Sequence, residues 1–101
     1  MKTVVLEAQS DNPLFSLQEK PIPVPCKGQV LVKVEVAPLN PADVMFVRGR
    51  YIQEKLLPVV PGTVASGTVV ASGGGLTANF MLGKRVCCAG LRYGDGPWSQ
   101  Y

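Results

Sequence analysis

The stretch QVLVKVEVAPLNPADVMFVRGRY, residues 29–51, decides the fold, because two different periodicities meet in it. In its first half every second residue is a valine, which is the period of a half-buried β-strand. In its second half, Asn40 is a favoured N-cap and Pro41 fits the first helical position. Asp43 then lies in the first turn, where the helix dipole favours a negative charge, and Gly49 is a natural helix stop. The stretch therefore predicts a strand, a turn and one short capped helix.

The segments on either side of this stretch predict further short strands. They are KTVVLEA, a strand within PLFSLQEKPIPVPCKGQ, residues 64–72, GKRVCCAG, and a last strand that begins in GDGPWSQY. Gly67 inside residues 64–72 predicts a bulge or a second backbone close by. The Pro-x-Pro-x-Pro run predicts a surface connector, with a polyproline ligand for a partner as the alternative. Residues 73–75 predict a hairpin or loose loop, so the whole pattern favours a small β-barrel or rolled sheet.

The composition is that of one folded domain. The chain has 101 residues, 47% of them hydrophobic and 17% charged. A net charge of +3, spread over scattered Lys and Arg, gives no argument for nucleic acid. No segment approaches the roughly 20 apolar residues that a membrane helix needs, and the start lacks a secretory signal. We therefore expect a cytoplasmic protein that binds neither nucleic acid nor membrane.

Several kinds of catalytic and binding site are excluded by the residues that the chain lacks. It contains no histidine, which removes Ser-His-Asp and Cys-His nucleophiles and every histidine metal site. Residues 73–75 lack the G-x-G-x-x-G spacing of a dinucleotide turn, and no Gly-Lys-Ser/Thr follows them. Cys26, Cys87 and Cys88 fit reduced thiols, with a redox role as the alternative.

Four motifs then follow one another in a recognisable order: GQVLVKVEVAPLNPADVMFVRGRY, PVVPGTVASGTVVASGGG, GKRV and GPWSQY. Together they resemble the N-terminal GroES-like domain of the medium-chain dehydrogenases/reductases. The resemblance is greatest to the zinc-independent quinone oxidoreductase branch, and it covers essentially all of residues 1–101. It implies a mainly β (α+β) fold, a partly open β-barrel with one short helix. It also implies a nucleotide-binding Rossmann domain that is absent from this chain, and a homodimer when the protein is full length.

The resemblance also bears on the metal. In the zinc-dependent members, a cysteine opens the helix segment and a Gly-His-Glu follows the later proline. Those positions here are Asn40, Thr63 and Val64, of which none is a good zinc ligand. We therefore expect no metal site. The implied chemistry is hydride transfer from NADPH, held mainly by the missing domain, to a quinone or an α,β-unsaturated carbonyl.

The resemblance implies a site around the short helix. Asn40 matches the residue that faces nicotinamide and substrate, although it could serve only as the helix cap. Tyr51 matches the G-x-Y tyrosine of the cleft, which donates a proton in enoyl reductases; an amphipathic tyrosine at a loop edge is the alternative. The predicted catalytic residues are Tyr51 and Asn40, the predicted cofactor residues are Asn40, Pro41 and Asp43, and the predicted substrate residues are Tyr51, Arg50 and Trp98.

Some alternatives stay open from the sequence. Asp43 also fits a helix-start role, Arg50 a solvated face, and Trp98 an anchor for the last strand. For the whole protein, an enoyl thioester reductase is the alternative within the same superfamily. A stand-alone, non-catalytic binding module built on the same barrel is the alternative outside it.

Overall fold

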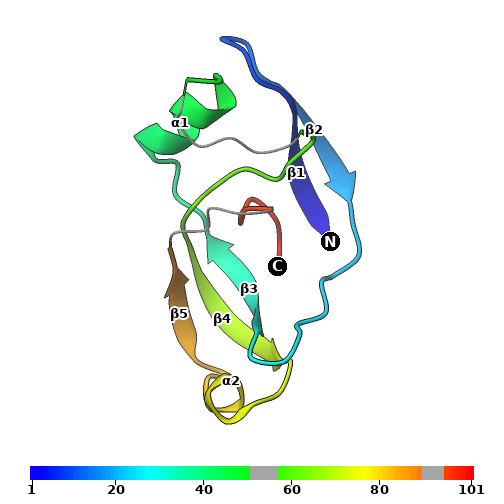
Figure 1. Cartoon of the computed structure of the whole chain (residues 1–101), viewed down its shortest axis with the longest axis vertical. Helices are drawn as coiled ribbons and strands as arrows, with labels where there is room; N and C mark the ends of the chain where they lie inside the picture. Colours follow the sequence, from blue (N-terminus) through cyan, green and yellow to red (C-terminus); the bar gives the residue numbers. More distant parts are fainter. Residues whose placement is uncertain (51–56, 90–94) are drawn as a thin grey trace.

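The computed structural model describes residues 1–50, 57–89 and 95–101 (Figure 1). Within these ranges the elements are β1 (Lys2–Ala8), β2 (Leu14–Glu19), β3 (Val30–Val36), α1 (Pro41–Val47), β4 (Ala65–Ser72), α2 (Leu76–Phe80) and β5 (Arg85–Cys88). The mainly β class predicted from the sequence is confirmed. The expectation of a single helix was wrong, because α2 forms directly after the glycine cluster. No helix of the described residues is long and apolar enough to cross a membrane.

The strands pair into two antiparallel sheets (Figure 1). One is the β1–β2 hairpin, and the other has the order β3–β4–β5. Gly67 lies in the central strand β4, where a Cβ atom would come 2.0 Å from the carbonyl oxygen of Lys33. The close second backbone predicted at this glycine is therefore confirmed. The predicted surface connector is also confirmed, since residues 21–24 are exposed and lie outside the strands.

A small core joins the hairpin to helix α1. The buried side chains of Leu6, Phe46, Val47 and Val59 form one cluster. Leu6 and Val59 also exchange backbone hydrogen bonds of 2.7 and 3.1 Å, which fix the segment after residue 57 against β1. Helix α1 thus packs against Leu6 of β1, and the Thr63 hydroxyl, which donates to Asp43, joins its first turn to the segment that leads into β4.

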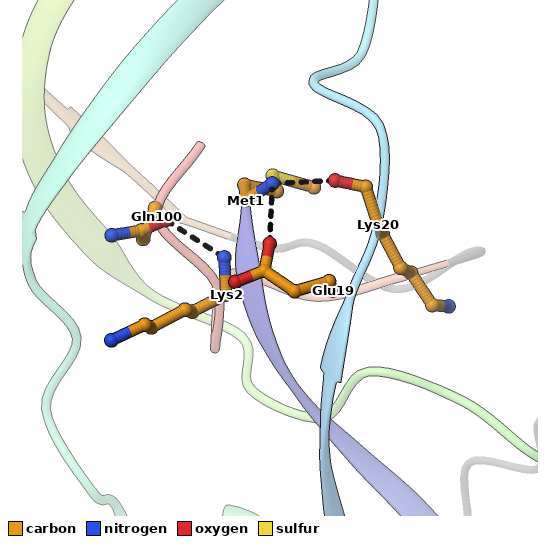
Figure 2. A network of polar contacts seen from close by, with 5 residues as sticks. All are labelled: Met1, Lys2, Glu19, Lys20 and Gln100. Carbon is orange, nitrogen blue, oxygen red and sulfur yellow. Dashed lines mark hydrogen bonds and ion pairs between the residues drawn. The ribbon is translucent and has the colours of Figure 1, made fainter.

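The last residues of the chain join the two sheets. On β1, the Val4 N–H donates to the Trp98 carbonyl at 2.9 Å; on β3, the Val34 N–H donates to the Gln100 carbonyl at 2.9 Å. Figure 2 shows the polar contacts at the start of β1, where the Lys2 N–H donates to Gln100 Oε1 at 2.7 Å. The amino group of Met1 pairs with Glu19 at 3.2 Å in the same network. Because neither sheet is large, these contacts fix how the two sheets sit relative to each other.

Candidate functional site

The first turn of α1 is built as the sequence predicts. Asn40 is the N-cap, with extended backbone angles of φ −94° and ψ 159°, and Pro41 follows at the first helical position. The Asn40 N–H donates to Asp43 Oδ2 at 2.9 Å, and the Asp43 N–H donates to the Asn40 carbonyl at 3.0 Å. These reciprocal bonds satisfy backbone groups that a helix start leaves without intrahelical partners. The side chain of Asn40 is half-buried at this edge.

The carboxylate of Asp43 connects α1 to the segment before β4. Asp43 is only 2% exposed. Its Oδ1 atom accepts a hydrogen bond of 3.3 Å from the Thr63 hydroxyl, while Oδ2 accepts the bond from Asn40. A buried carboxylate is stable only when its oxygens are hydrogen-bonded, so the two donors explain how Asp43 is tolerated there. This position fits the helix-start role, and the predicted cofactor role of Asp43 and Pro41 stays a prediction.

The indole ring of Trp98 packs against the segment that carries Thr63. Gly62, the residue before Thr63, lies so close to it that a Cβ atom would come 2.5 Å from Trp98 Cδ1. On another side, the ring centroid of Trp98 is 6.3 Å from that of Phe15, with the planes tilted by 37°. The indole Nε1 is buried and has no hydrogen-bond partner among the described residues. Trp98 therefore acts as a packing anchor, and its predicted contact with substrate stays a prediction.

The structure places Arg50 away from this set. Its Nη2 atom pairs with Asp11 Oδ1 at 2.6 Å, beside the turn of the β1–β2 hairpin, and both side chains are largely exposed. Arg50 follows the end of α1, where Gly49 adopts a positive φ of 73°. This exposed ion pair fits the solvated-face interpretation, and the predicted substrate role of Arg50 stays a prediction. Tyr51 lies outside the described residues.

The structure thus brings Asn40, Pro41 and Asp43 together and adds Thr63, which the sequence singled out only as a lost zinc position. No group of three or more Cys, Asp or Glu side chains among the described residues could hold a metal ion. Two hollows, of about 420 and 290 Å³, are lined by described residues outside α1, and Trp98 lines the hollow of 420 Å³.

Comparisons with known proteins agree on one family. Residues 26–99 match the alcohol dehydrogenase GroES-like domain. The chain is 36% identical, over 67 residues, to the quinone oxidoreductase of Rattus norvegicus; the match spans 66% of this chain and 20% of that protein.

Two solved structures extend the match to nearly the whole chain. One is a putative NADPH:quinone reductase from Mesorhizobium loti, with a TM-score of 0.80 and 30% identity over 99% of this chain and 33% of that one. The other is the yhdH oxidoreductase from Salmonella enterica in complex with NADP, with a TM-score of 0.76 and 27% identity over 99% and 31%. The chain thus spans about a fifth to a third of these relatives.

Proposed function

Because this chain belongs to the alcohol dehydrogenase GroES-like domain family, we propose that it is the acceptor-side domain of an NADPH-dependent quinone oxidoreductase. The whole protein would reduce a quinone or an α,β-unsaturated carbonyl without zinc. Support comes from the similarity to a quinone oxidoreductase and to a putative NADPH:quinone reductase. Further support comes from Asn40 and Thr63, which occupy positions that hold zinc ligands in the zinc-dependent members of the family.

The Asn40–Asp43–Thr63 set is the observation that carries the proposal. In the zinc-dependent members to which the chain is similar, the positions of Asn40 and Thr63 hold metal ligands. Here the Thr63 hydroxyl and the Asn40 N–H both donate to the buried Asp43 carboxylate. Amide and hydroxyl groups are poor zinc ligands, and each of Asp43's oxygens already accepts a hydrogen bond. The set is therefore suited to orienting uncharged polar groups.

The residues present fit a nicotinamide at this edge. The Asp43 carboxylate is almost fully buried, whereas Asn40 beside it is half-buried and carries a neutral side-chain amide. A reduced nicotinamide, when bound, supplies the hydride and its two electrons. The side-chain NH₂ of Asn40 would donate to the acceptor oxygen, which would stabilise the negative charge that develops there. Asp43 acts as a positioning residue, since it fixes the backbone of Asn40 and the hydroxyl of Thr63. Tyr51 is the proposed donor of the proton that the reduced oxygen takes up.

Two substitutions separate the amide of Asn40 from its role as helix cap. Asn40→Ser and Asn40→Ala both remove the side-chain amide, and both keep the backbone N–H and carbonyl that bond to Asp43. We expect both variants of the full-length protein to lose roughly a hundredfold in kcat for NADPH-dependent quinone reduction, as when an oxyanion donor is removed. Thermal melting should change little for either variant, because the bonds to Asp43 use the backbone of Asn40. If Asn40→Ser kept full activity, Asn40 would be a cap and nothing more.

The activity itself has a direct test. Full-length protein is assayed for NADPH oxidation over a panel of quinones and α,β-unsaturated aldehydes. Turnover with quinones supports the proposal. If the folded protein oxidised NADPH with no member of the panel, the proposed reaction would be wrong.

A further inference from the structure

Helix α2 presents apolar side chains outward at one end of the molecule. Leu76 is 90% exposed and Phe80 is 72% exposed, whereas Ala78 is the buried residue of the helix. Leu76 and Phe80 are four positions apart, so they share one helical face. Figure 1 shows α2 at the end of the long axis that is furthest from α1 and from the turn of the hairpin. Exposed apolar side chains that lie together on one face are a feature of interaction surfaces.

The charges around this helix are of one sign. Lys84 Nζ lies 4.2 Å from the centroid of the Phe80 ring. The turn containing Lys27 is fixed beside the start of α2, because the Gly28 N–H donates to the Gly74 carbonyl at 2.9 Å. Residues 20–34 and 55–94 contain no Asp or Glu. Neither Lys27 nor Lys84 has an ion-pair partner among the described residues; Glu35, from the far end of β3, pairs with Arg85. We call Lys27, Leu76, Phe80, Leu82 and Lys84 the α2 tip.

The tip is a fixed structure. The Ser72 hydroxyl donates to Asn79 Oδ1 at 2.7 Å, which joins α2 to the end of β4. The Val69 N–H donates to the Lys84 carbonyl and the Gly83 N–H to the Val69 carbonyl, both at 2.9 Å. Leu76 and Phe80 are therefore held outward by the fold, and little conformational entropy is lost when the tip meets a partner.

We propose that the α2 tip docks the protein on an anionic lipid surface. Because α2 lies at one end of the long axis, Leu76 and Phe80 can enter the boundary between headgroups and acyl chains while the lysines stay with the headgroups (Figure 1). An anionic leaflet attracts such a cationic rim, and no carboxylate in residues 20–34 or 55–94 opposes it. The expectation of no membrane contact rested on the lack of a spanning segment, and surface docking requires none. The inference does not depend on the proposed reaction.

The test measures binding of the purified protein to vesicles. Phosphatidylcholine vesicles and vesicles that also contain phosphatidylserine are sedimented with the protein. We expect sedimentation only with phosphatidylserine present, weakened by added salt. Leu76→Ser with Phe80→Ser should weaken binding roughly a hundredfold, because two buried apolar side chains are lost. Lys84→Glu should weaken it roughly tenfold or more.

Matched controls lie on other parts of the surface. Leu14→Ser with Leu17→Ser removes two leucines of β2 that are 59% and 70% exposed, and Arg48→Glu reverses an exposed charge at the end of α1. Both should bind as the unmodified protein does, with all variants matched by circular dichroism. A Phe80→Trp variant should show extra fluorescence that brominated lipids quench. If the unmodified protein bound neither kind of vesicle, or if the controls lost binding as the tip variants do, the proposal would be wrong. If neither kind of vesicle bound the protein, an acidic protein surface would become the candidate partner of the α2 tip.

Discussion

Gly62→Ala tests whether the indole ring of Trp98 is held in a fixed position against Gly62. The added Cβ atom would lie 2.5 Å from Trp98 Cδ1 and 2.9 Å from Pro97 Cδ, well inside van der Waals contact. Gly62 also has a φ of +104°, a conformation that side-chain-bearing residues rarely adopt. The backbone strain costs about 1–3 kcal/mol and the overpacking about 1–3 kcal/mol more. We therefore expect the free energy of unfolding to fall by about 2–6 kcal/mol, measured by urea denaturation followed by circular dichroism.

Gly74→Ala is the matched control, because it separates strain from collision. Gly74 has nearly the same φ, +106°, but a Cβ atom there would meet nothing within 4 Å. This variant should lose only the strain, about 1–3 kcal/mol. The difference between the two alanine variants should shrink when Trp98→Leu is added to both, since the colliding ring is then gone and only the contact with Pro97 Cδ remains. If the two alanine variants unfolded at the same urea concentration with Trp98 present, the indole would not be fixed against Gly62 and the reasoning would be wrong.

Three further predictions concern the buried carboxylate, the thiols and the tyrosine. Asp43→Asn should lower the free energy of unfolding by about 1–3 kcal/mol, because one carboxylate oxygen that accepts a hydrogen bond becomes an NH₂ donor; an unchanged melting temperature would contradict its double acceptor role. Iodoacetamide at neutral pH should label the exposed Cys26 and Cys87 before Cys88, because burial, and then the neighbouring Cys87, raise the pKa of the Cys88 thiol. Because the pKa of Cys88 is higher in the folded than in the unfolded protein, this thiol stabilises the fold at pH values below the ordinary thiol pKa, and the urea midpoint should fall as the pH rises through the raised pKa. Equal labelling of all three thiols would contradict the raised pKa of Cys88. Tyr51→Phe should cause a large loss of turnover if the protein is an enoyl thioester reductase and a modest loss if it is a quinone reductase, measured by steady-state kinetics with both substrates.

The fold was predictable wherever local chemistry and periodicity agree. The alternating valines of residues 30–36 predict β3, and the Asn40–Pro41 pair predicts the start of α1; the structure confirms both. Helix α2 was missed for a physical reason. It has five residues and buries only Ala78 among them, so it lacks the apolar stripe by which amphipathic helices are recognised. Its formation depends instead on the positive φ of Gly75 and on the bond from Ser72 to Asn79.

The candidate site was predictable only in part. The contact between Asn40 and Asp43 spans three residues and follows from the rules of helix capping. The contact from Thr63 to Asp43 spans 20 residues, and the ion pair from Arg50 to Asp11 spans 39. Such pairs depend on how strands and loops pack, so no local pattern points to them. The available signal for Thr63 was its match to a metal-ligand position in the zinc-dependent relatives.

The geometry of the site rests on residues that contribute none of its chemistry. Thr63 reaches Asp43 because the segment before it is held from two sides. On one side Val59 pairs with Leu6 of β1, and on the other the Gly96 N–H donates to the Val60 carbonyl at 2.7 Å. A Cβ atom at Gly96 would come 2.3 Å from the Gly62 carbonyl oxygen, so the two chain segments are in direct backbone contact. Since residues 96–100 also join the two sheets, a disturbance there would shift Thr63 relative to α1. The precision of the Asn40–Asp43–Thr63 set is therefore a property of the whole β framework, and helix capping alone would not provide it.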